Sequence, residues 1–107
     1  MGAGKLDQRV QVLERTKNRD SHGATVDVWT PEGQPLWAGV EELSGREMEV
    51  VSQVVGETTH RFTFRKTDRV TRKKRLKWKG REFDVNHVGT KPEDRNRWTV
   101  ATGKELV

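Results

Sequence analysis

The three histidines are the residues best suited to hold a metal ion or to move protons near neutral pH. His22 lies in a predicted turn, His60 at the start of a predicted strand and His87 inside another. No pair has the H-x-x-x-H or H-E-x-x-H spacing that places two imidazoles on one face of a helix, and there is no cysteine to add thiolate ligands. The sequence therefore predicts neither a metal site nor a bound cofactor.

Motifs for hydrolysis and phosphate binding are also missing. Ser21, Ser44 and Ser52 are the only serines, and none lies in a G-x-S-x-G elbow. The chain has no G-x-x-x-x-G-K-[ST] loop and no G-x-G-x-x-G loop. Glu41 and Glu42 are consecutive, so on a strand they point to opposite faces and cannot act as an acid–base pair. We therefore expect a protein that is not an enzyme.

Residues 61–81, RFTFRKTDRVTRKKRLKWKGR, form the most basic segment, with 11 Lys/Arg and one Asp. Aromatic residues are interleaved with the charges, a composition typical of nucleic-acid-binding barrels. Strand alternation, however, places the aromatic side chains on the inward face, whereas stacking on bases requires them on the exposed face. A solvated surface and a sequence-independent contact with phosphates are both open interpretations. The candidates for contacts with DNA or with another subunit are Arg61, Arg65, Arg72, Lys73, Lys74 and Arg75.

Composition predicts one folded domain, residues 1–107, with a small core. Hydrophobic residues make up 31% of the chain and the mean hydropathy is -0.94, but four tryptophans argue against disorder. The absence of cysteine fits a reducing compartment, such as the cytoplasm. The N-terminus has no apolar segment of a signal peptide, and no apolar run approaches the roughly 18 residues of a membrane span, so we expect no membrane partner.

The charges are divided unequally along the chain. Residues 1–60 carry 6 Lys/Arg and 10 Asp/Glu, a net charge of -4, whereas residues 61–107 carry 15 and 6, a net charge of +9. Chance clustering on a solvated surface is one explanation. The other is a subunit whose acidic side meets the basic side of a neighbour, or whose basic face meets nucleic acid.

Alternation of apolar and polar residues predicts six or seven short strands. They cover residues 6–15, 25–30, 36–43, 61–66, 75–80, 81–88 and 97–102, separated by turns at His22-Gly23 and Gly80 and by a polar loop over residues 90–97. Strands at this spacing favour an all-β fold, a small antiparallel β-barrel or sandwich. The predicted core residues are Val10, Val12, Val28, Trp37, Val40, Phe62, Phe64, Trp78, Phe83, Val85, Trp98 and Val100.

Residues 44–58 depart from this alternation and are predicted to form a long insert between two strands. The pairs Val50/Val54 and Val51/Val55 have the i,i+4 spacing of a helix, although valine is a poor helix former. The insert is expected to be either a mobile segment or one short helix, and an ordinary helix packed on the barrel mouth is the alternative. Its candidate interface residues are Ser44, Gly45, Arg46, Glu47, Met48, Val50, Val51, Val54 and Val55.

A collinear set of short motifs resembles a known family. The set comprises L-D-Q-R-V, D-S-H-G-A, W-A-G-V-E-E-L-S-G-R-E, T-T-H-R-F-T-F-R, G-R-E-F-D-V and R-W-T-V-A. Over residues 4–101 the chain resembles the head–tail joining, or head-closure, proteins of long-tailed phages and prophages. Residues 37–47 and 59–61 are the most specific part. The run Arg72-Lys73-Lys74-Arg75 is more basic than this family leads us to expect.

The resemblance implies a structural protein of the virion neck, made in the host cytoplasm. It implies a small β-barrel that assembles as a homo-oligomeric ring, a dodecamer matching the portal, between the portal or adaptor ring and the tail. The ring would close the head after packaging and give the tail terminator or tail tube its attachment surface. Packaged double-stranded DNA would pass through its lumen. The family also implies that the insert acts at the lumen or at the subunit interfaces.

The insert is thus predicted to be the assembly or gating element. The acidic residues Glu41, Glu42, Glu47 and Glu49 are predicted to lie against a neighbour's residues 61–81. Two alternatives remain open: a basic nucleic-acid-binding module resembling an OB or SH3-like barrel, and a tail-completion ring built on a similar barrel.

Overall fold

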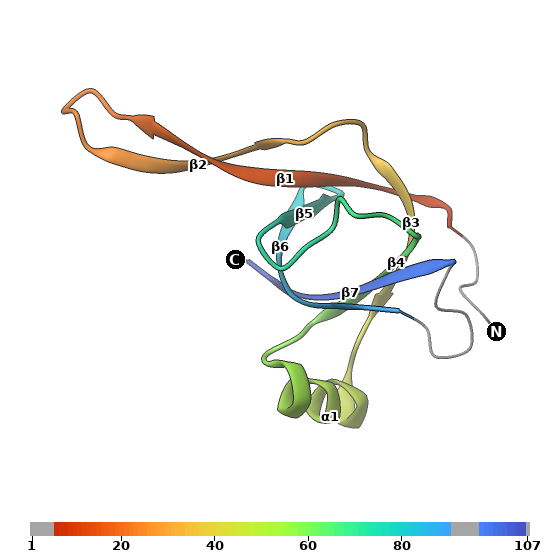
Figure 1. The fold of residues 1–107 in the computed structure, drawn as a ribbon. Helices are drawn as coiled ribbons and strands as arrows, with labels where there is room; N and C mark the ends of the chain where they lie inside the picture. The colour runs from red at the N-terminus through yellow and green to blue at the C-terminus, as the bar shows by residue number, and fades with distance from the viewer. Residues whose placement is uncertain (1–5, 91–96, 107) are drawn as a thin grey trace.

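The computed structural model describes residues 6–90 and 97–106, so most of the predicted polar loop lies outside the described residues. The described part contains seven strands and one helix (Figure 1). The elements are β1 (Gln8–Arg19), β2 (Thr25–Pro31), β3 (Leu36–Glu42), α1 (Gly45–Val55), β4 (His60–Arg65), β5 (Arg75–Trp78), β6 (Arg81–Gly89) and β7 (Trp98–Glu105).

Six of the strands close into an antiparallel barrel. The order is β1-β3-β4-β7-β6-β5, and pairing of β5 with β1 completes the circle. Each of the six strands is thus paired on both sides, and such closure is how small β proteins avoid edge-to-edge aggregation. The predicted all-β barrel is confirmed, and the insert is a single short helix between β3 and β4.

Strand β1 changes partner twice along its length. It pairs with β3 over residues 8–10, with β5 over 11–13 and with β2 over 13–19. Its distal half therefore leaves the barrel with β2 as a two-stranded ribbon, here called the arm (residues 14–30; Figure 1). In the turn at its tip, the Asp20 carboxylate accepts hydrogen bonds from the backbone N–H groups of His22 (2.8 Å) and Ala24 (2.9 Å).

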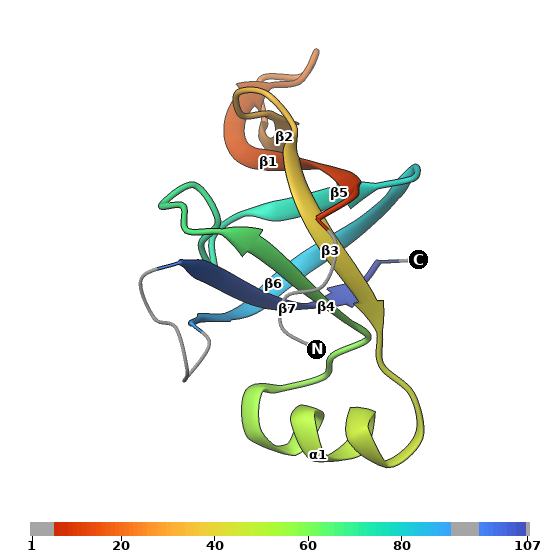
Figure 2. The ribbon, with the colours of Figure 1, turned by 90° about the vertical axis from the view of Figure 1, so that its right-hand side faces the viewer.

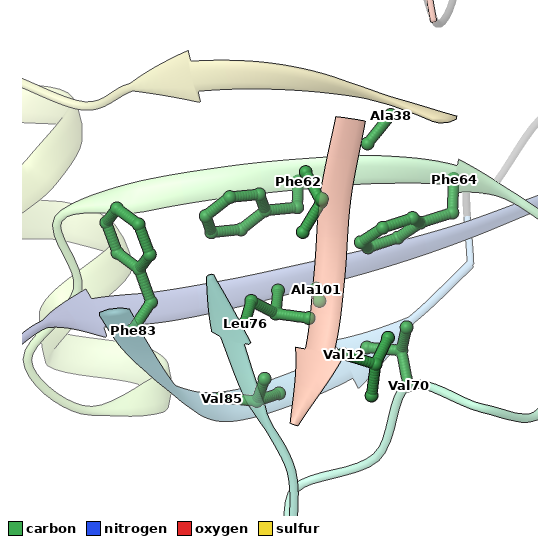
Figure 3. Packing of buried hydrophobic residues seen from close by; sticks show 10 residues of the cluster. Val12, Ala38, Phe62, Phe64, Val70, Leu76, Phe83, Val85 and Ala101 are labelled. Atoms are coloured by element: carbon green, nitrogen blue, oxygen red, sulfur yellow. The ribbon is translucent and has the colours of Figure 1, made fainter. Parts of the chain in front are cut away.

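The barrel interior is filled by side chains from every strand of the closed circle (Figure 3). The rings of Phe62 and Phe64 on β4 lie at its centre, and the residues opposite them on β7 are the smaller Ala101 and Thr99. Large residues on one strand are thus matched by small ones on the next, as a narrow barrel requires. The predicted core residues that are buried are Val10, Val12, Phe62, Phe64, Phe83 and Val85, and Val40 and Trp78 pack half-buried against them.

Four predicted core residues lie elsewhere. Trp37 is 53% exposed, because its neighbour Ala38 takes the inward position and successive strand residues alternate between faces. Trp98 and Val100 are on the outer face of β7, since Thr99 and Ala101 face the phenyl rings of β4. Val28 belongs to the arm, beyond the barrel.

Strand β6 contains an irregularity that positions a polar side chain. Val85 pairs with Gly103 and His87 with Thr102, so Asn86 is an extra residue without a partner on β7. Such a bulge turns a side chain away from the regular alternation. The backbones of β6 and β7 are close here, and a Cβ on Gly103 would lie 2.9 Å from the carbonyl oxygen of Asp84.

Candidate assembly surface

Helix α1 stands outside the barrel, below its lower end in both views (Figures 1 and 2). None of its residues is buried, and Val50 and Val54 are 51% and 79% exposed. The half-buried positions Met48, Val51 and Val55 recur at i, i+3 and i+7, so they lie on one face of the helix. The exposed valines lie on another face, where the described chain leaves them uncovered.

The N-terminal end of α1 is tied to β4 by charge. The Arg61 guanidinium on β4 lies 2.9 Å from the Glu41 carboxylate and 3.4 Å from that of Glu47, in the first helical turn. Glu47 is also stabilised by the positive end of the helix dipole. The backbone N–H of Leu43, just before the helix, donates to the carbonyl of Thr59 at 2.9 Å.

The C-terminal end of α1 is tied to the barrel by a hydrogen-bond network centred on Thr58. Its backbone N–H donates to the Ser52 hydroxyl at 3.1 Å, and its own hydroxyl donates to the carbonyl of Gly56 at 2.8 Å. Gly56 has φ 98°, which favours glycine and lets the chain turn back from the helix. Thr58 itself is 1% exposed, so its polar atoms depend on these partners.

Asn86 connects this network to the sheet. From the bulge in β6, its amide donates to the Glu57 carbonyl (2.7 Å) and to the Thr58 hydroxyl (2.9 Å). Its side-chain oxygen accepts from the Thr102 hydroxyl at 2.7 Å. One side chain therefore joins β6, β7 and the end of α1. Of the two forms predicted for the insert, a mobile segment or one short helix, the structure contains the short helix, held at both ends.

A buried histidine lies beside the same end of the barrel. His60 is 2% exposed and its ring centroid is 4.7 Å from that of Phe83, edge to face. Its Nδ1 is 2.9 Å from the Thr59 hydroxyl. Burial lowers the pKa of His60, and the positive charge of Arg81 lowers it further. His60 is therefore a neutral core residue and not a surface ligand.

Arg81 and Glu105 form a bidentate ion pair that joins β6 to β7. The Nε–Oε2 and Nη2–Oε1 distances are 2.7 and 2.6 Å. These hydrogen bonds lower the pKa of Glu105 and raise that of Arg81. The pair is structural and holds the ends of two barrel strands together.

The predicted basic residues do not form one continuous patch. Arg61 pairs with the acidic side chains beside α1, and Arg65 lies over the Trp98 ring at 5.9 Å. Lys74 lies 3.6 Å from carboxylate oxygens of both Glu14 and Glu32.

Arg75 is neutralised in the same way, because its Nε is 2.8 Å from Asp84 and its guanidinium stacks 4.3 Å from the Trp29 ring centroid. Arg72 and Lys73 are exposed and make no ion pair among the described residues. Only these two members of the RKKR run are therefore available to a partner.

The acidic residues that were predicted to contact a neighbouring subunit are in part already paired within their own chain. Glu41 and Glu47 pair with Arg61 of the same subunit. Glu42 and Glu49 are exposed, with no ion pair among the described residues.

Two further features bear on the kind of site present. Residues 6–90 and 97–106 contain no group of three or more His, Asp or Glu side chains arranged to hold a metal ion. None of the described helices is long and apolar enough to cross a membrane. The features that stand out among the described residues are the exposed helix and its hydrogen-bonded base.

Comparison with known proteins identifies the family of this chain. The profile of the phage head completion protein family matches residues 1–105. The chain belongs to this family. This confirms the family resemblance: the chain is a structural component of a virion, and its family is not an enzymatic one. No curated protein matches the chain.

Two solved structures share the fold. Protein SF1141 from Shigella flexneri 2a, a solution structure, has a TM-score of 0.73 at 22% identity over 97% of this chain and 96% of its own. A chain in the virion of a native gene transfer agent particle has a TM-score of 0.58 at 17% identity, covering 94% of this chain and 96% of its own. At these identities the likeness concerns the fold alone.

Proposed function

We propose that this head completion protein forms a homo-oligomeric ring in the neck of the virion, between the portal or adaptor ring and the tail. The ring closes the DNA-filled head and offers the tail terminator or tail tube its attachment surface. The observation that carries the proposal is α1, an already formed helix held outside the barrel with Val50 and Val54 uncovered. An exposed apolar helix face is a typical element of protein–protein contacts.

The fixed geometry of α1 makes assembly energetically favourable. Burying Val54 against another subunit contributes at most roughly 1.5–3 kcal/mol, and Val50, which is already half-buried, contributes about half as much. A mobile insert of about ten residues would first lose on the order of 10 kcal/mol in backbone entropy. Because both ends of α1 are already bound to the barrel, most of that cost is met when the subunit folds. Each contact remains weak by itself, which suits a subunit that assembles only on an acceptor ring.

Charge matching between neighbours has a smaller role than the sequence alone indicated. Arg61 already satisfies Glu41 and Glu47 within one subunit. Glu42 and Glu49 remain as acidic groups that could face a neighbour's Arg72 and Lys73. In this proposal the uncovered valines drive the contact, and the remaining charges orient it.

The ring has the symmetry of the portal, that of a dodecamer, and packaged DNA passes through its lumen. The protein is made in the host cytoplasm and resides in the virion. The fold supports this placement, because the gene transfer agent chain that shares it is itself part of a virion.

Deletion of the gene from the phage or prophage that encodes it tests the proposal. Electron microscopy of lysates should show finished tails separate from heads, with the heads having lost their DNA. Intact, infectious, tailed particles would overturn the neck function. Heads that retain DNA beside tails with malformed ends would instead indicate a tail-completion ring.

A further inference from the structure

The arm has one basic face. The register between β1 and β2 places Arg15 opposite Trp29 and Lys17 opposite Asp27, and directly opposite residues share a face of the ribbon. Arg19 follows on the same face because strand side chains repeat every second residue. Arg15, Lys17 and Arg19 form a row of cations along this face. Asp27 lies 3.7 Å from Arg15 and is the one acidic group beside the row.

The opposite face of the arm is uncharged beyond its base. Thr16 pairs with Val28 and Asn18 with Val26, so these four side chains share that face. The two faces of one ribbon thus differ in charge, and the basic one is the face that carries an aromatic ring.

A second group of cations faces this row at the base of the arm. Arg72 and Lys73, in the turn before β5, line one depression together with Arg15, Trp29 and Lys74, and the carboxylate of this depression is that of Asp84. Arg75 lies over the Trp29 ring and is bound to Asp84, so it holds the indole in place rather than offering charge. The arm cleft, as defined here, comprises this depression, with Arg15, Trp29, Arg72 and Lys73, and the residues Lys17 and Arg19 that continue the row along the arm beyond it.

Most of the charge in this cleft is uncompensated. Lys17, Arg19, Arg72 and Lys73 are exposed and have no ion pair among the described residues. On the barrel, Arg61 and Arg81 are paired with carboxylates of the same subunit, whereas Lys66 and Lys77 make no ion pair among the described residues. The arm cleft brings four cations of this second kind together.

The spacing of these cations suits a linear polyanion. Consecutive cations of the row are about 6.8 Å apart along an antiparallel strand, so the three span about 14 Å. One strand of duplex DNA presents a phosphate for about every 3.4 Å of helix axis, so this length faces about four phosphates. A two-stranded ribbon also has the width that the major groove of DNA admits.

We propose that the arm cleft binds the phosphate backbone of double-stranded DNA without regard to sequence. This deepens the proposed neck function, because packaged DNA is the nucleic acid that a head completion ring meets. An acidic protein segment is the competing occupant. The regular spacing of the row and the ribbon shape favour the duplex.

Binding of DNA by the isolated full-length chain tests the proposal. Fluorescence anisotropy with a labelled duplex of mixed sequence, about 20 base pairs long, is measured between about 50 and 200 mM salt. Four free cations predict a slope of about -3.6 in log K against log salt, which is a loss of affinity of about 150-fold over that range. An acidic peptide such as poly-glutamate serves as the competing probe.

Two variants with the same net charge show where the DNA binds. Lys17→Gln/Arg72→Gln removes one cation from each side of the arm cleft and should reduce the slope to about -1.8. Arg9→Gln/Lys66→Gln also lowers the net charge by two. Arg9 lies about 20 Å from Arg15 along β1, and Lys66 is an exposed residue after β4, a strand that pairs with neither β1, β2 nor β5. This control should keep the full slope.

Equal losses in the two variants, or no salt-dependent binding at all, would overturn the proposal. Tight binding of poly-glutamate in place of DNA would assign the cleft to an acidic protein. None of these results depends on the phenotype of the gene deletion, so failure of the DNA contact and failure of the neck function are distinguishable.

Discussion

Replacement of Asn86 by alanine should release the C-terminal end of α1 from the barrel. The side chain donates two hydrogen bonds, to the Glu57 carbonyl and the Thr58 hydroxyl, and accepts a third from Thr102. Since Thr58 is 1% and Thr102 8% exposed, water cannot readily replace the partner that these two hydroxyls lose, whereas the exposed Glu57 carbonyl can bond to water.

The magnitude follows from these three bonds. At about 0.5–1.5 kcal/mol each, their loss lowers the free energy of unfolding by about 2–4 kcal/mol. For a chain of about 100 residues this corresponds to a fall in Tm of roughly 10–20 °C. Asn86→Asp keeps the acceptor for Thr102 but loses both donors, so it should recover little of the difference.

Thermal unfolding followed by circular dichroism measures the stability, and amide hydrogen exchange measures the local effect. In Asn86→Ala the amides of α1 should lose protection before those of β4 and β7, because the helix opens as a separate unit. The matched control is Asn18→Ala, an exposed asparagine on the arm, which should change stability by less than about 0.5 kcal/mol. If Asn86→Ala is as stable as this control, or if α1 exchange is unchanged, the hydrogen-bonded base does not hold the helix.

Two further predictions concern assembly and pH. Val54→Asp should leave the isolated subunit folded but fail to complement the gene deletion, because Val54 is 79% exposed and its proposed partner is another protein. The control Gln53→Asp introduces the same acidic residue at the adjacent exposed position and should complement the deletion. If the two variants behave alike, α1 is not part of the assembly surface. Because the pKa of His60 is lowered in the folded state, the unfolded chain binds the proton first as the pH falls. The free energy of unfolding should therefore be constant above about pH 6.5 and decline below it until the pH reaches the folded-state pKa, by at most about 1.4 kcal/mol per pH unit. His60→Phe should reduce this slope in urea titrations between about pH 7.5 and 5.5, and a slope identical to that of the unchanged protein would show that another group causes it.

The sequence determined the approximate positions of the strands. Period-two alternation defined the strands, since a half-buried strand must place apolar side chains on one face. The helical spacing of Val50/Val54 and Val51/Val55 was present too, but valine's low helix propensity left two structures open. Tertiary contacts decided between them: Arg61 holds the first turn and Thr58 the last.

Which face of a strand points inward depended on the pairing between strands. Alternation shows that Trp98 and Val100 share a face, but not that this face is the outer one. That follows from the position of β7 beside β4, where Phe62 and Phe64 leave room only for Ala101 and Thr99. The same limit applies to Trp37, which is outward because Ala38 fills the interior position.

Only part of the proposed assembly surface could be predicted from the sequence. The insert could be located at residues 44–58, because its composition breaks the strand pattern. Asn86 could not be identified, because a bulge is a property of two paired strands and this one turns an ordinary polar residue toward α1. The basic segment likewise looked continuous, yet folding brings Glu14, Glu32 and Asp84 to Lys74 and Arg75. Composition determines the net charge of the chain. Whether a given charged side chain is available to a partner depends on its distance from other charged groups, which only the folded structure determines.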